Sequence, residues 1–218
     1  IRAGDFYNAR PKPGKAEKRP LGIPVIKDRV VQMAAKLVME PIFETNFLPC
    51  SYGVRPERDA PMALREIQRV ITFQGQTIVV DADIRSYFDR IPHQPLLNLV
   101  RRRISDPRMI KLIKGWLEAG VMDEGVHFPS DGIGTPQGGV ISPLLANIYL
   151  HYVFDLWGQN WRERYARGDV ILVRFADDIL AGFQHRSDAE RFLADLRERF
   201  AKFCLELHPD KTRVIENS

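Results

Sequence analysis

Apolar and polar residues repeat along the chain with two periods, which separate predicted helices from predicted strands. Apolar spacings of three and four predict helices over residues 28–47, 60–71, 93–103, 107–119, 142–165 and 187–203. Short β-branched or apolar runs predict strands over residues 77–84, 169–175 and 179–183, and a strand, a turn and a strand over residues 205–215. Because helices separate strands along the chain, the pattern favours an α+β fold, with helices on one face of a sheet.

The first predicted helix has a continuous apolar stripe, formed by Val30, Met33, Ala34, Leu37, Val38 and Ile42. Pro41 is expected to bend or end this helix, because proline lacks the amide hydrogen that a helix uses. Residues 9–26 are rich in Pro, Gly and Lys before they turn apolar, which predicts a loop or hairpin tip leading into a short strand.

The composition is that of a globular protein with a substantial core, since 44% of the 218 residues are hydrophobic and 28% are charged. This length allows one large domain, or one domain with an added lobe. No apolar run approaches the length of a membrane span, and no signal-peptide pattern opens the sequence. Cys50 and Cys204 lie far apart without metal-ligand spacing, so a reduced, cytoplasmic protein is the simplest expectation.

The net charge of +4 favours an anionic partner only weakly. Its distribution says more, because residues 1–40 contain nine Lys or Arg and four Asp or Glu. This basic excess fits either an anion-binding segment or an ordinary solvated surface, and the segment alone favours neither.

The strongest chemical signal is the pair of adjacent carboxylates Asp177 and Asp178 in the apolar run "VRFADDIL". Burial of a carboxylate is costly and neighbouring like charges repel, so a bound cation would relieve both penalties. In the predicted strand 77–84, side-chain alternation places Asp81 and Asp83 on one face and does not separate them. A hairpin tip beside this strand end would bring three carboxylates together, which suits Mg²⁺. The alternative is a plain polar turn.

A second signal is the glycine-rich segment before the predicted helix 142–165. Gly134, Gly138 and Gly139 would let the backbone approach a ligand closely. Gln137 offers a hydrogen-bond donor and an acceptor, and the N-terminus of the helix favours anions. An ordinary glycine turn explains these residues equally well.

Three basic residues are candidates for phosphate chemistry. Lys12 and Arg19 in the basic opening would grip a triphosphate, since a guanidinium binds two oxygens at once. Lys211 follows a predicted strand, where its ammonium would serve as a proton donor, although a surface position is the commoner fate of a lysine.

Together these segments resemble the sequence blocks of reverse transcriptases, most closely those of the bacterial group II intron type. They occur in family order and cover nearly the whole chain. The matching blocks are residues 18–32, 51–56, 80–93, 134–151, 173–180 and 205–215. The resemblance implies a right-hand polymerase with fingers over residues 1–75 and a palm over residues 76–218, where an antiparallel sheet is backed by helices.

The same resemblance implies RNA-directed DNA synthesis with two Mg²⁺ ions, or Mn²⁺ in their place. The partners would be an RNA template, a DNA or RNA primer and dNTPs, with the intron RNA as a further candidate and no membrane. Asp83 matches the first metal ligand because it lies five residues before Phe88, which leaves Asp81 without an assigned role. The metal would be held by Asp83, Asp177, Asp178 and the backbone carbonyl of Ile84.

Phe88 matches the aromatic residue that excludes a 2′-hydroxyl; its alternative role is that of a core aromatic, which Tyr87 fits better. Residues expected to contact the nucleotide are Lys12, Arg19, Phe88, Gln137 and Gly138, with Lys15 or Lys18 as alternatives to Lys12. Residues expected to contact nucleic acid are Arg55, Pro136 and Phe175. Lys211 matches the proton donor to pyrophosphate.

Two departures from the family pattern change these expectations. The hairpin usually begins with Tyr, and Phe175 keeps the ring but lacks the hydroxyl, so primer positioning is expected to change slightly. The chain stops at Ser218, where a helical thumb would follow, so a fingers and palm portion without a thumb is expected.

Three other functions remain open at this point. One is a non-catalytic RNA-binding module that assists intron splicing, although RNA binding alone would gain from removing the carboxylates. Another is a CRISPR-associated or other host-domesticated reverse transcriptase. The third is a nucleotidyl cyclase or unrelated palm polymerase, which would lack the "TPQGG" and "HPDKT" segments.

Overall fold

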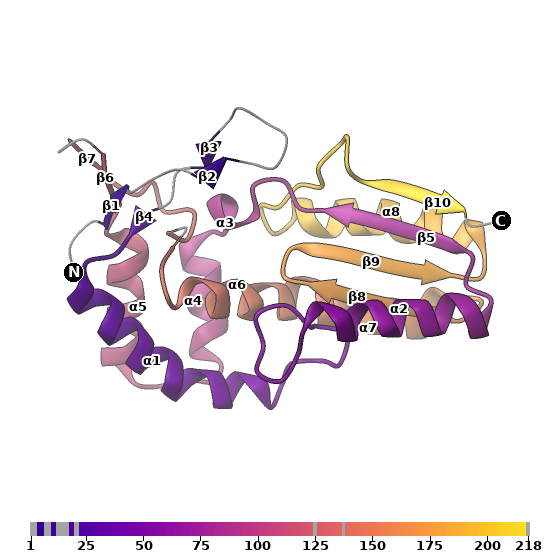
Figure 1. Ribbon diagram of the computed structural model, residues 1–218, viewed down its shortest axis with the longest axis horizontal. Helices are drawn as coiled ribbons and strands as arrows, with labels where there is room; N and C mark the ends of the chain where they lie inside the picture. The colour runs from indigo at the N-terminus through magenta and orange to yellow at the C-terminus, as the bar shows by residue number, and fades with distance from the viewer. Residues whose placement is uncertain are drawn as a thin grey trace. The chain divides into compact units, whose positions relative to one another are not determined.

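The computed structural model describes residues 4–6, 10–11, 18–19, 22–123, 126–136 and 138–216 (Figure 1). The chain forms two compact units, and each unit combines two chain segments. The first unit comprises Ile1–Thr45 and Phe88–Tyr149, and the second comprises Asn46–Tyr87 and Leu150–Ser218. The division into fingers and palm at residue 75 stays a prediction.

The second unit is built on a four-stranded sheet with the strand order β10-β5-β9-β8, in which neighbouring strands are antiparallel, as predicted. The strands are β5 (Ile78–Asp83), β8 (Val170–Phe175), β9 (Asp178–Phe183) and β10 (Arg213–Glu216). Of the β5 residues, Ile78, Val79 and Val80 are all buried. Because successive side chains point to opposite faces, both faces of the sheet are covered at this end.

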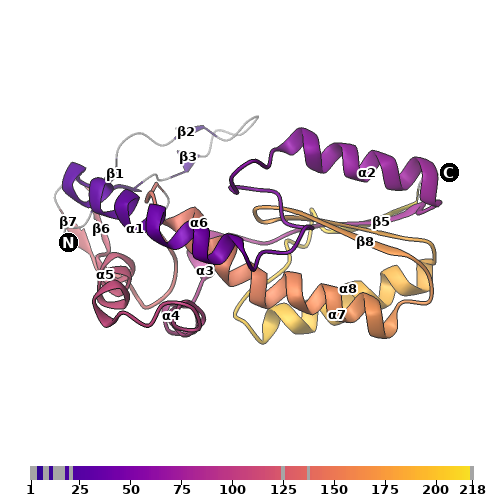
Figure 2. The same cartoon turned by 90° about the horizontal axis from the view of Figure 1, so that it is seen from below.

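Helices lie on both faces of this sheet. α7 (Leu156–Tyr165) and α8 (Arg186–Ala201) cover one face, and α2 (Ala60–Gln74) lies along the other face beside β8 (Figure 2). The expectation of helices on one face was therefore incomplete. α2 begins where Asp59 accepts a hydrogen bond from the Met62 amide at 2.8 Å, and its Ala63 and Val70 side chains are buried.

Aromatic side chains fill the core between the sheet, α7 and α8. Phe183 and Phe192 have no exposed surface, and their ring centroids are 5.3 Å apart. Trp161 packs edge-on against both rings. Phe203, just after α8, is half-buried, and its ring centroid lies 4.3 Å from the Arg199 guanidinium.

The long helix predicted over residues 142–165 is interrupted. α6 (Ser142–Leu150) continues into a π-helical turn, η1 (His151–Asp155), before α7 begins. π-turns are rare, and a period of 3.6 residues does not reveal them. Arg199 of α8 donates hydrogen bonds to the carbonyls of Tyr152 at 3.1 Å and Val153 at 3.0 Å, which satisfies backbone oxygens of the widened turn.

The first unit contains a small sheet of order β4-β1-β6-β7, an antiparallel β2–β3 hairpin and several helices. The hairpin agrees with the prediction for the basic opening. The elements are β1 (Gly4–Phe6), β2 (Arg10–Pro11), β3 (Lys18–Arg19), β4 (Gly22–Ile23), β6 (Val121–Asp123), β7 (Val126–Phe128), α1 (Ile26–Glu44), α3 (Tyr87–Arg90, which begins at the junction), α4 (His93–Arg101) and α5 (Pro107–Glu118), together with α6 up to Tyr149.

α1 continues through Pro41 and ends at Glu44, so the proline does not end the helix. Much of the predicted apolar stripe is exposed, namely Val30, Met33, Leu37 and Val38. The buried positions are Gln32, Ala35, Met39 and Phe43. Apolar residues occur on both sides of α1, so periodicity alone does not select its buried face. Among the described residues, no helix is long and apolar enough to cross a membrane.

Candidate active site

Two carboxylates face each other at the end of the second unit's sheet. β5 and β9 pair so that Asp83 lies opposite Asp178, and Asp81 lies opposite Leu180. Directly opposed residues of an antiparallel pair project to the same face, so Asp83 and Asp178 are neighbours there. Val80 and Ala82 are buried while Asp81 and Asp83 are partly exposed, so both acids lie on the predicted common face.

The hairpin between β8 and β9 holds the adjacent acids. Phe175 ends β8, Asp178 begins β9, and their Cα atoms are paired. Between them, Ala176 has a φ of 55°, the left-handed region that costs a residue with a Cβ about 1–2 kcal/mol. Something else in the structure must therefore hold this tight turn in place.

The carboxylates at this end of the sheet interact electrostatically with one another. The pKa of the Asp178 carboxyl is raised, first by partial burial and then by the negative charges of Asp177 and Asp83. Asp81 adds to this effect, and the Lys211 ammonium opposes it. Four carboxylates and one ammonium therefore interact at this end of the sheet.

Lys211 reaches the strand end through the "HPDKT" turn. Its Nζ lies 2.5 Å from Asp83 Oδ2, and Arg213 Nε lies 3.3 Å from Asp81 Oδ2. The turn is anchored to β5 because the His208 amide donates to the Asp83 carbonyl at 2.8 Å. Sequence reasoning found Lys211 but not its partner, and it missed Arg213, whose position in β10 opposite Asp81 depends on strand register.

Ile84 was expected to offer its backbone carbonyl to a metal. Its side chain is buried, and it forms an isolated bridge with Leu207. The hydrogen bonds on either side of that bridge join Arg85 to Glu206 and His208 to Asp83, so they do not use the Ile84 carbonyl. The expected role of this carbonyl stays a prediction.

Several predicted nucleotide contacts belong to the first unit. Phe88 is half-buried, and its carbonyl accepts a hydrogen bond from the Thr135 amide at 2.7 Å. Gly134 packs so closely on this segment that an added Cβ would lie 3.2 Å from the Asp89 carbonyl oxygen. The structure therefore brings the glycine-rich segment against Phe88, a contact between distant stretches that spacing does not predict. Gly138 has a φ of 108°, which suits glycine.

The structure gives less information on the other residues predicted to contact nucleotide or nucleic acid. Pro136 is half-buried and its carbonyl accepts from the Gly139 amide at 3.1 Å. Arg19 lies in β3 opposite Arg10. Lys12 and Gln137 lie outside the described residues. The structure tests no nucleotide contact, so these roles stay predictions.

Arg55, expected at the nucleic acid, is bonded within its own loop. It is buried and donates to the carbonyls of Leu48 at 2.8 Å and Ser51 at 2.7 Å. Its guanidinium also lies 5.3 Å from the Phe47 ring. These contacts shape the loop before α2, and a nucleic-acid contact by Arg55 stays a prediction.

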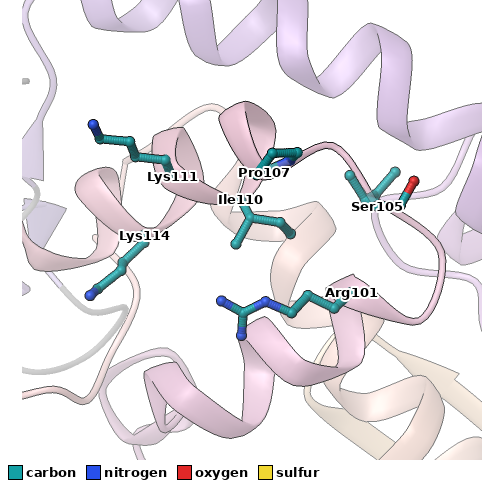
Figure 3. A pocket seen from close by; sticks show the side chains of 7 residues that line it. Arg101, Ser105, Pro107, Ile110, Lys111 and Lys114 are labelled. Carbon is teal, nitrogen blue, oxygen red and sulfur yellow. The ribbon is translucent and has the colours of Figure 1, made fainter.

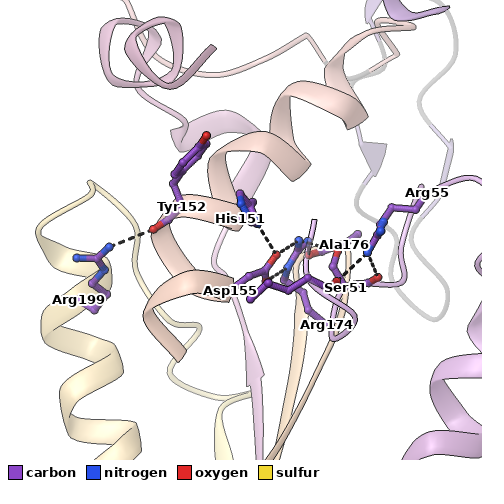
Figure 4. A network of polar contacts seen from close by, with 9 residues as sticks. Ser51, Arg55, His151, Tyr152, Asp155, Arg174, Ala176 and Arg199 are labelled. Atoms are coloured by element: carbon purple, nitrogen blue, oxygen red, sulfur yellow. Dashed lines mark hydrogen bonds and ion pairs between the residues drawn. The ribbon is translucent and has the colours of Figure 1, made fainter. Parts of the chain in front are cut away.

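A buried ion pair beneath the hairpin was missed by sequence reasoning. Arg174 of β8 binds both carboxylate oxygens of Asp155 at 2.7 Å, and neither side chain has exposed surface (Figure 4). Arg174 also donates to Ser51 Oγ at 2.7 Å and to the Ala176 carbonyl at 3.0 Å. A charged residue within the apolar strand "VILVRF" is the sequence signal that could have revealed it.

Within the described part of the chain, no group of three or more His, Cys, Asp or Glu side chains is arranged to hold a metal ion. The donor chemistry nevertheless fits a hard cation, because the potential ligands at the strand end are carboxylate and carbonyl oxygens, one of which pairs with the Lys211 ammonium here. Partial burial and then repulsion from Asp177 and Asp83 raise the pKa of Asp178, and a cation would relieve that repulsion.

An antiparallel sheet backed by helices, with paired acids at a hairpin beside an acidic strand end, has the architecture of a polymerase palm. The family model described as reverse transcriptase (RNA-dependent DNA polymerase) matches residues 10–218. The chain therefore belongs to the reverse transcriptase family, which confirms the resemblance found in the sequence.

Similar proteins include intron-encoded ones. The chain is 42% identical over 140 residues to the group II intron-encoded protein LtrA of Lactococcus lactis, covering 64% of this chain and 23% of LtrA. It is 44% identical over 204 residues to a 91 kDa protein in the cob intron of Schizosaccharomyces pombe, covering 92% of this chain and 24% of that protein. Protein YkfC of Escherichia coli is 47% identical over 153 residues, or 69% of this chain and 39% of YkfC.

The chain thus spans well under half the length of these relatives. Among solved structures, telomerase from Candida albicans with a TWJ fragment of telomeric RNA matches with a TM-score of 0.68. This match covers 100% of the chain and 42% of the telomerase at 10% identity, so it supports the reverse transcriptase fold alone.

Proposed function

We propose that this chain is the nucleotidyl-transfer portion of an RNA-directed DNA polymerase from a group II intron or a related element. It extends a DNA or RNA primer on an RNA template with dNTPs. The observation that supports this most directly is the register that sets Asp83 opposite Asp178, next to Asp177. A structural turn would not need three acids at one strand end.

Asp83, Asp177, Asp178 and the Ile84 carbonyl would hold two Mg²⁺ ions, with Mn²⁺ as a substitute. When bound, such ions activate the primer hydroxyl and neutralise charge on the transferred phosphate. The protein's own part is to hold these oxygens on neighbouring strands before the substrate arrives, which lowers the reorganisation that the reaction requires.

Lys211 would act on the leaving group. Its ammonium lies 2.5 Å from Asp83 Oδ2, so it balances the charge of that carboxylate without substrate. With substrate bound, the same ammonium would donate a proton to the departing pyrophosphate. Phe88 would exclude the 2′-hydroxyl, while Lys12, Arg19, Gln137 and Gly138 would contact the nucleotide. Pro136 and Phe175 would contact the template and primer.

Primer extension on RNA and DNA templates, with and without Mg²⁺, tests this function. Asp83→Asn and Asp177→Asn are expected to abolish extension while the fold, followed by circular dichroism, stays intact. Asp81→Asn is the matched control, because Asp81 lies on the same strand and face but opposite Leu180, and a smaller effect is expected. Near-normal extension by either of the first two variants would contradict the proposal.

A second function, RNA binding of the kind that assists intron splicing, is supported by a separate basic surface. A cavity of about 430 Å³ lies between α4 and α5, with the buried side chains of Ile104 and Ile110 in its lining. Arg101 extends from α4 toward Ile110 on α5, and Lys111 and Lys114 lie along α5 (Figure 3). Cations around a partly apolar hollow suit a nucleic-acid strand.

The charge at this surface is concentrated. Residues 101–118 contain six basic and two acidic residues, an excess of four that equals the net charge of the whole chain. Asp106 pairs with Arg108 at 3.1 Å and Glu118 with Lys114 at 3.6 Å. Arg101 donates a hydrogen bond to Asn98 Oδ1 at 3.2 Å, but among the described residues neither Arg101 nor Lys111 has a carboxylate partner, so the charge of both is available to phosphates.

Fluorescence anisotropy with labelled RNA at several salt concentrations tests this second function. The double variant Arg101→Glu/Lys111→Glu is expected to weaken binding at least tenfold and to reduce the salt dependence by about one contact per lost cation. Lys202→Glu, a charge reversal on the second unit, is the control. Equal affinity of the double variant and the control would remove this function and leave the polymerase proposal standing.

A further inference from the structure

The Asp155–Arg174 pair is unusual because of where its hydrogen bonds lead. Arg174 is fixed by two hydrogen bonds to Asp155 in the π-helical turn and by one to Ser51 Oγ. A further hydrogen bond runs from Arg174 to the Ala176 carbonyl at 3.0 Å. Ala176 immediately precedes Asp177, so a fully buried guanidinium is connected directly to the turn that presents the acids (Figure 4).

The loop that contains Ser51 holds the same hairpin from another side. The Arg174 amide donates to the Cys50 carbonyl at 2.7 Å, and the Tyr52 amide donates to the Arg174 carbonyl at 2.8 Å. Gly53 then passes so close that an added Cβ would lie 2.2 Å from the Ala176 amide nitrogen. Backbone contact on this scale fixes the turn tightly, because only glycine leaves enough space.

The other partners in the network are fixed as well. Arg55 ties the loop together through the carbonyls of Leu48 and Ser51. On the helix, Arg199 holds the carbonyls of the π-helical turn, and His151 Nδ1 lies 3.8 Å from Asp155 Oδ2. The π-turn changes the direction in which helix residues project, and here it contains the residue that receives Arg174.

Stability alone does not account for this arrangement. A buried ion pair is often no better for stability than well-packed apolar residues, and its attested use is to specify one geometry among alternatives. The turn that it supports has a residue with a Cβ in the left-handed region, which persists only where the surroundings enforce it. The burial of the Arg174 charge and the left-handed φ of Ala176 both oppose stability, and they occur within three residues, Arg174 to Ala176.

We propose that Asp155, Arg174 and Ser51 are positioning residues, which set the hairpin turn so that Asp177 and Asp178 meet Asp83 in the geometry for metal binding and nucleotidyl transfer. This inference rests on the proposed polymerase function. It predicts that the network influences the acids through the Ala176 carbonyl and makes no contact with substrate.

The test compares Ser51→Ala and Asp155→Asn with Asp188→Asn. Asp188 is a buried carboxylate of the same unit that accepts a hydrogen bond from the Arg167 amide at 2.8 Å, beyond the end of the β8–β9 hairpin opposite to its turn. Each variant is assayed below its melting temperature for single-turnover primer extension, dNTP KM and the Mg²⁺ concentration at half-maximal rate. Mn²⁺ binding is measured separately by electron paramagnetic resonance.

Ser51→Ala is expected to fold, to keep its dNTP KM, to lose at least tenfold in rate and to need more Mg²⁺. Asp155→Asn should show larger changes of the same kind, and Asp188→Asn should lose stability but keep rate and metal affinity. If Asp155→Asn fails to fold, the rate and metal affinity of Ser51→Ala decide whether the proposal holds. Wild-type rate, Mg²⁺ dependence and Mn²⁺ affinity in Ser51→Ala would overturn the proposal. An inactive wild-type chain would count against the polymerase function, while Mn²⁺ binding would still test the network.

Discussion

Replacement of Arg174 by Met is expected to destabilise the second unit by about 3–5 kcal/mol, because it leaves a buried carboxylate without its compensating charge. Asp155 has no exposed surface, and both of its oxygens accept hydrogen bonds from Arg174 at 2.7 Å. Met fills much of the space of the Arg stem, so the expected loss comes from the charge more than from a cavity. The lost bonds to Ser51 and Ala176 account for about 1 kcal/mol each within this total.

The pH dependence of this loss has a definite sign. In the wild-type chain, burial acts to raise the pKa of the Asp155 carboxyl, but the charge and hydrogen bonds of Arg174 lower it overall below the ordinary 3.8. Such a group stabilises the fold above its unfolded pKa, and this stability is lost as pH falls through the folded value. In Arg174→Met, burial would raise this pKa instead, so the deficit relative to wild type should shrink as pH falls from about 7 to about 5.

Urea unfolding followed by tryptophan fluorescence measures the effect, and Trp116→Phe as a common background leaves Trp157 and Trp161 of the second unit as the reporters. With a slope of about 2 kcal/mol per molar urea, the expected loss lowers the midpoint by about 2 M. The double variant Asp155→Leu/Arg174→Met should recover much of that stability, because no unpaired charge remains. Its primer extension should stay slow, since the Ala176 carbonyl still lacks its donor. A midpoint shift below about 0.5 M in the single variant would refute the reasoning, as would a double variant no more stable than the single one.

Three further predictions follow from individual residues. A thiol reagent should modify exposed Cys204 quickly and half-buried Cys50 much more slowly, because burial, followed by the charge of Asp155, raises the pKa of the Cys50 thiol to about 12; two fast thiols would contradict this. Gly53→Ala should slow primer extension strongly, because its Cβ would collide with the Ala176 amide; a wild-type rate would show that the turn adapts. Phe88→Val should raise ribonucleotide incorporation with a near-normal melting temperature, since Phe88 is only half-buried; unchanged selection for dNTPs would return sugar recognition to another residue.

The sheet was predictable because each of its main strands has a recognisable local sequence pattern. β5, β8 and β9 are short β-branched or apolar runs bounded by polar segments, and their order along the chain limits how they can pair. Alternation also predicted that Asp81 and Asp83 share a face. It did not separate them, because the difference lies in register: Asp83 faces Asp178 and binds Lys211, whereas Asp81 faces Leu180 and binds Arg213.

The features that the sequence pattern did not predict also have specific physical causes. The π-turn at His151–Asp155 changes the helical period only locally, within a segment whose apolar spacing looks continuous. α1 has apolar residues on both sides, so its buried face depends on contacts such as that of Gln32, whose Oε1 accepts a hydrogen bond from the distant Val140 amide at 2.8 Å. Helix cover on the second face of the sheet also follows from tertiary packing, which the pattern of α2 does not specify.

Several structurally unfavourable features occur together at the hairpin between β8 and β9, and their concentration there bears on function. Within residues 174–178 the chain buries a guanidinium, places Ala176 at a φ of 55° and sets Asp178 where partial burial and neighbouring acids raise its pKa. Each departure opposes stability, and sequences that fold well usually keep local preferences and global structure consistent. Exceptions are expected where geometry serves chemistry. A hairpin that was only a connection between β8 and β9 would have no reason to combine all three, so the combination favours a turn held for the placement of its acids.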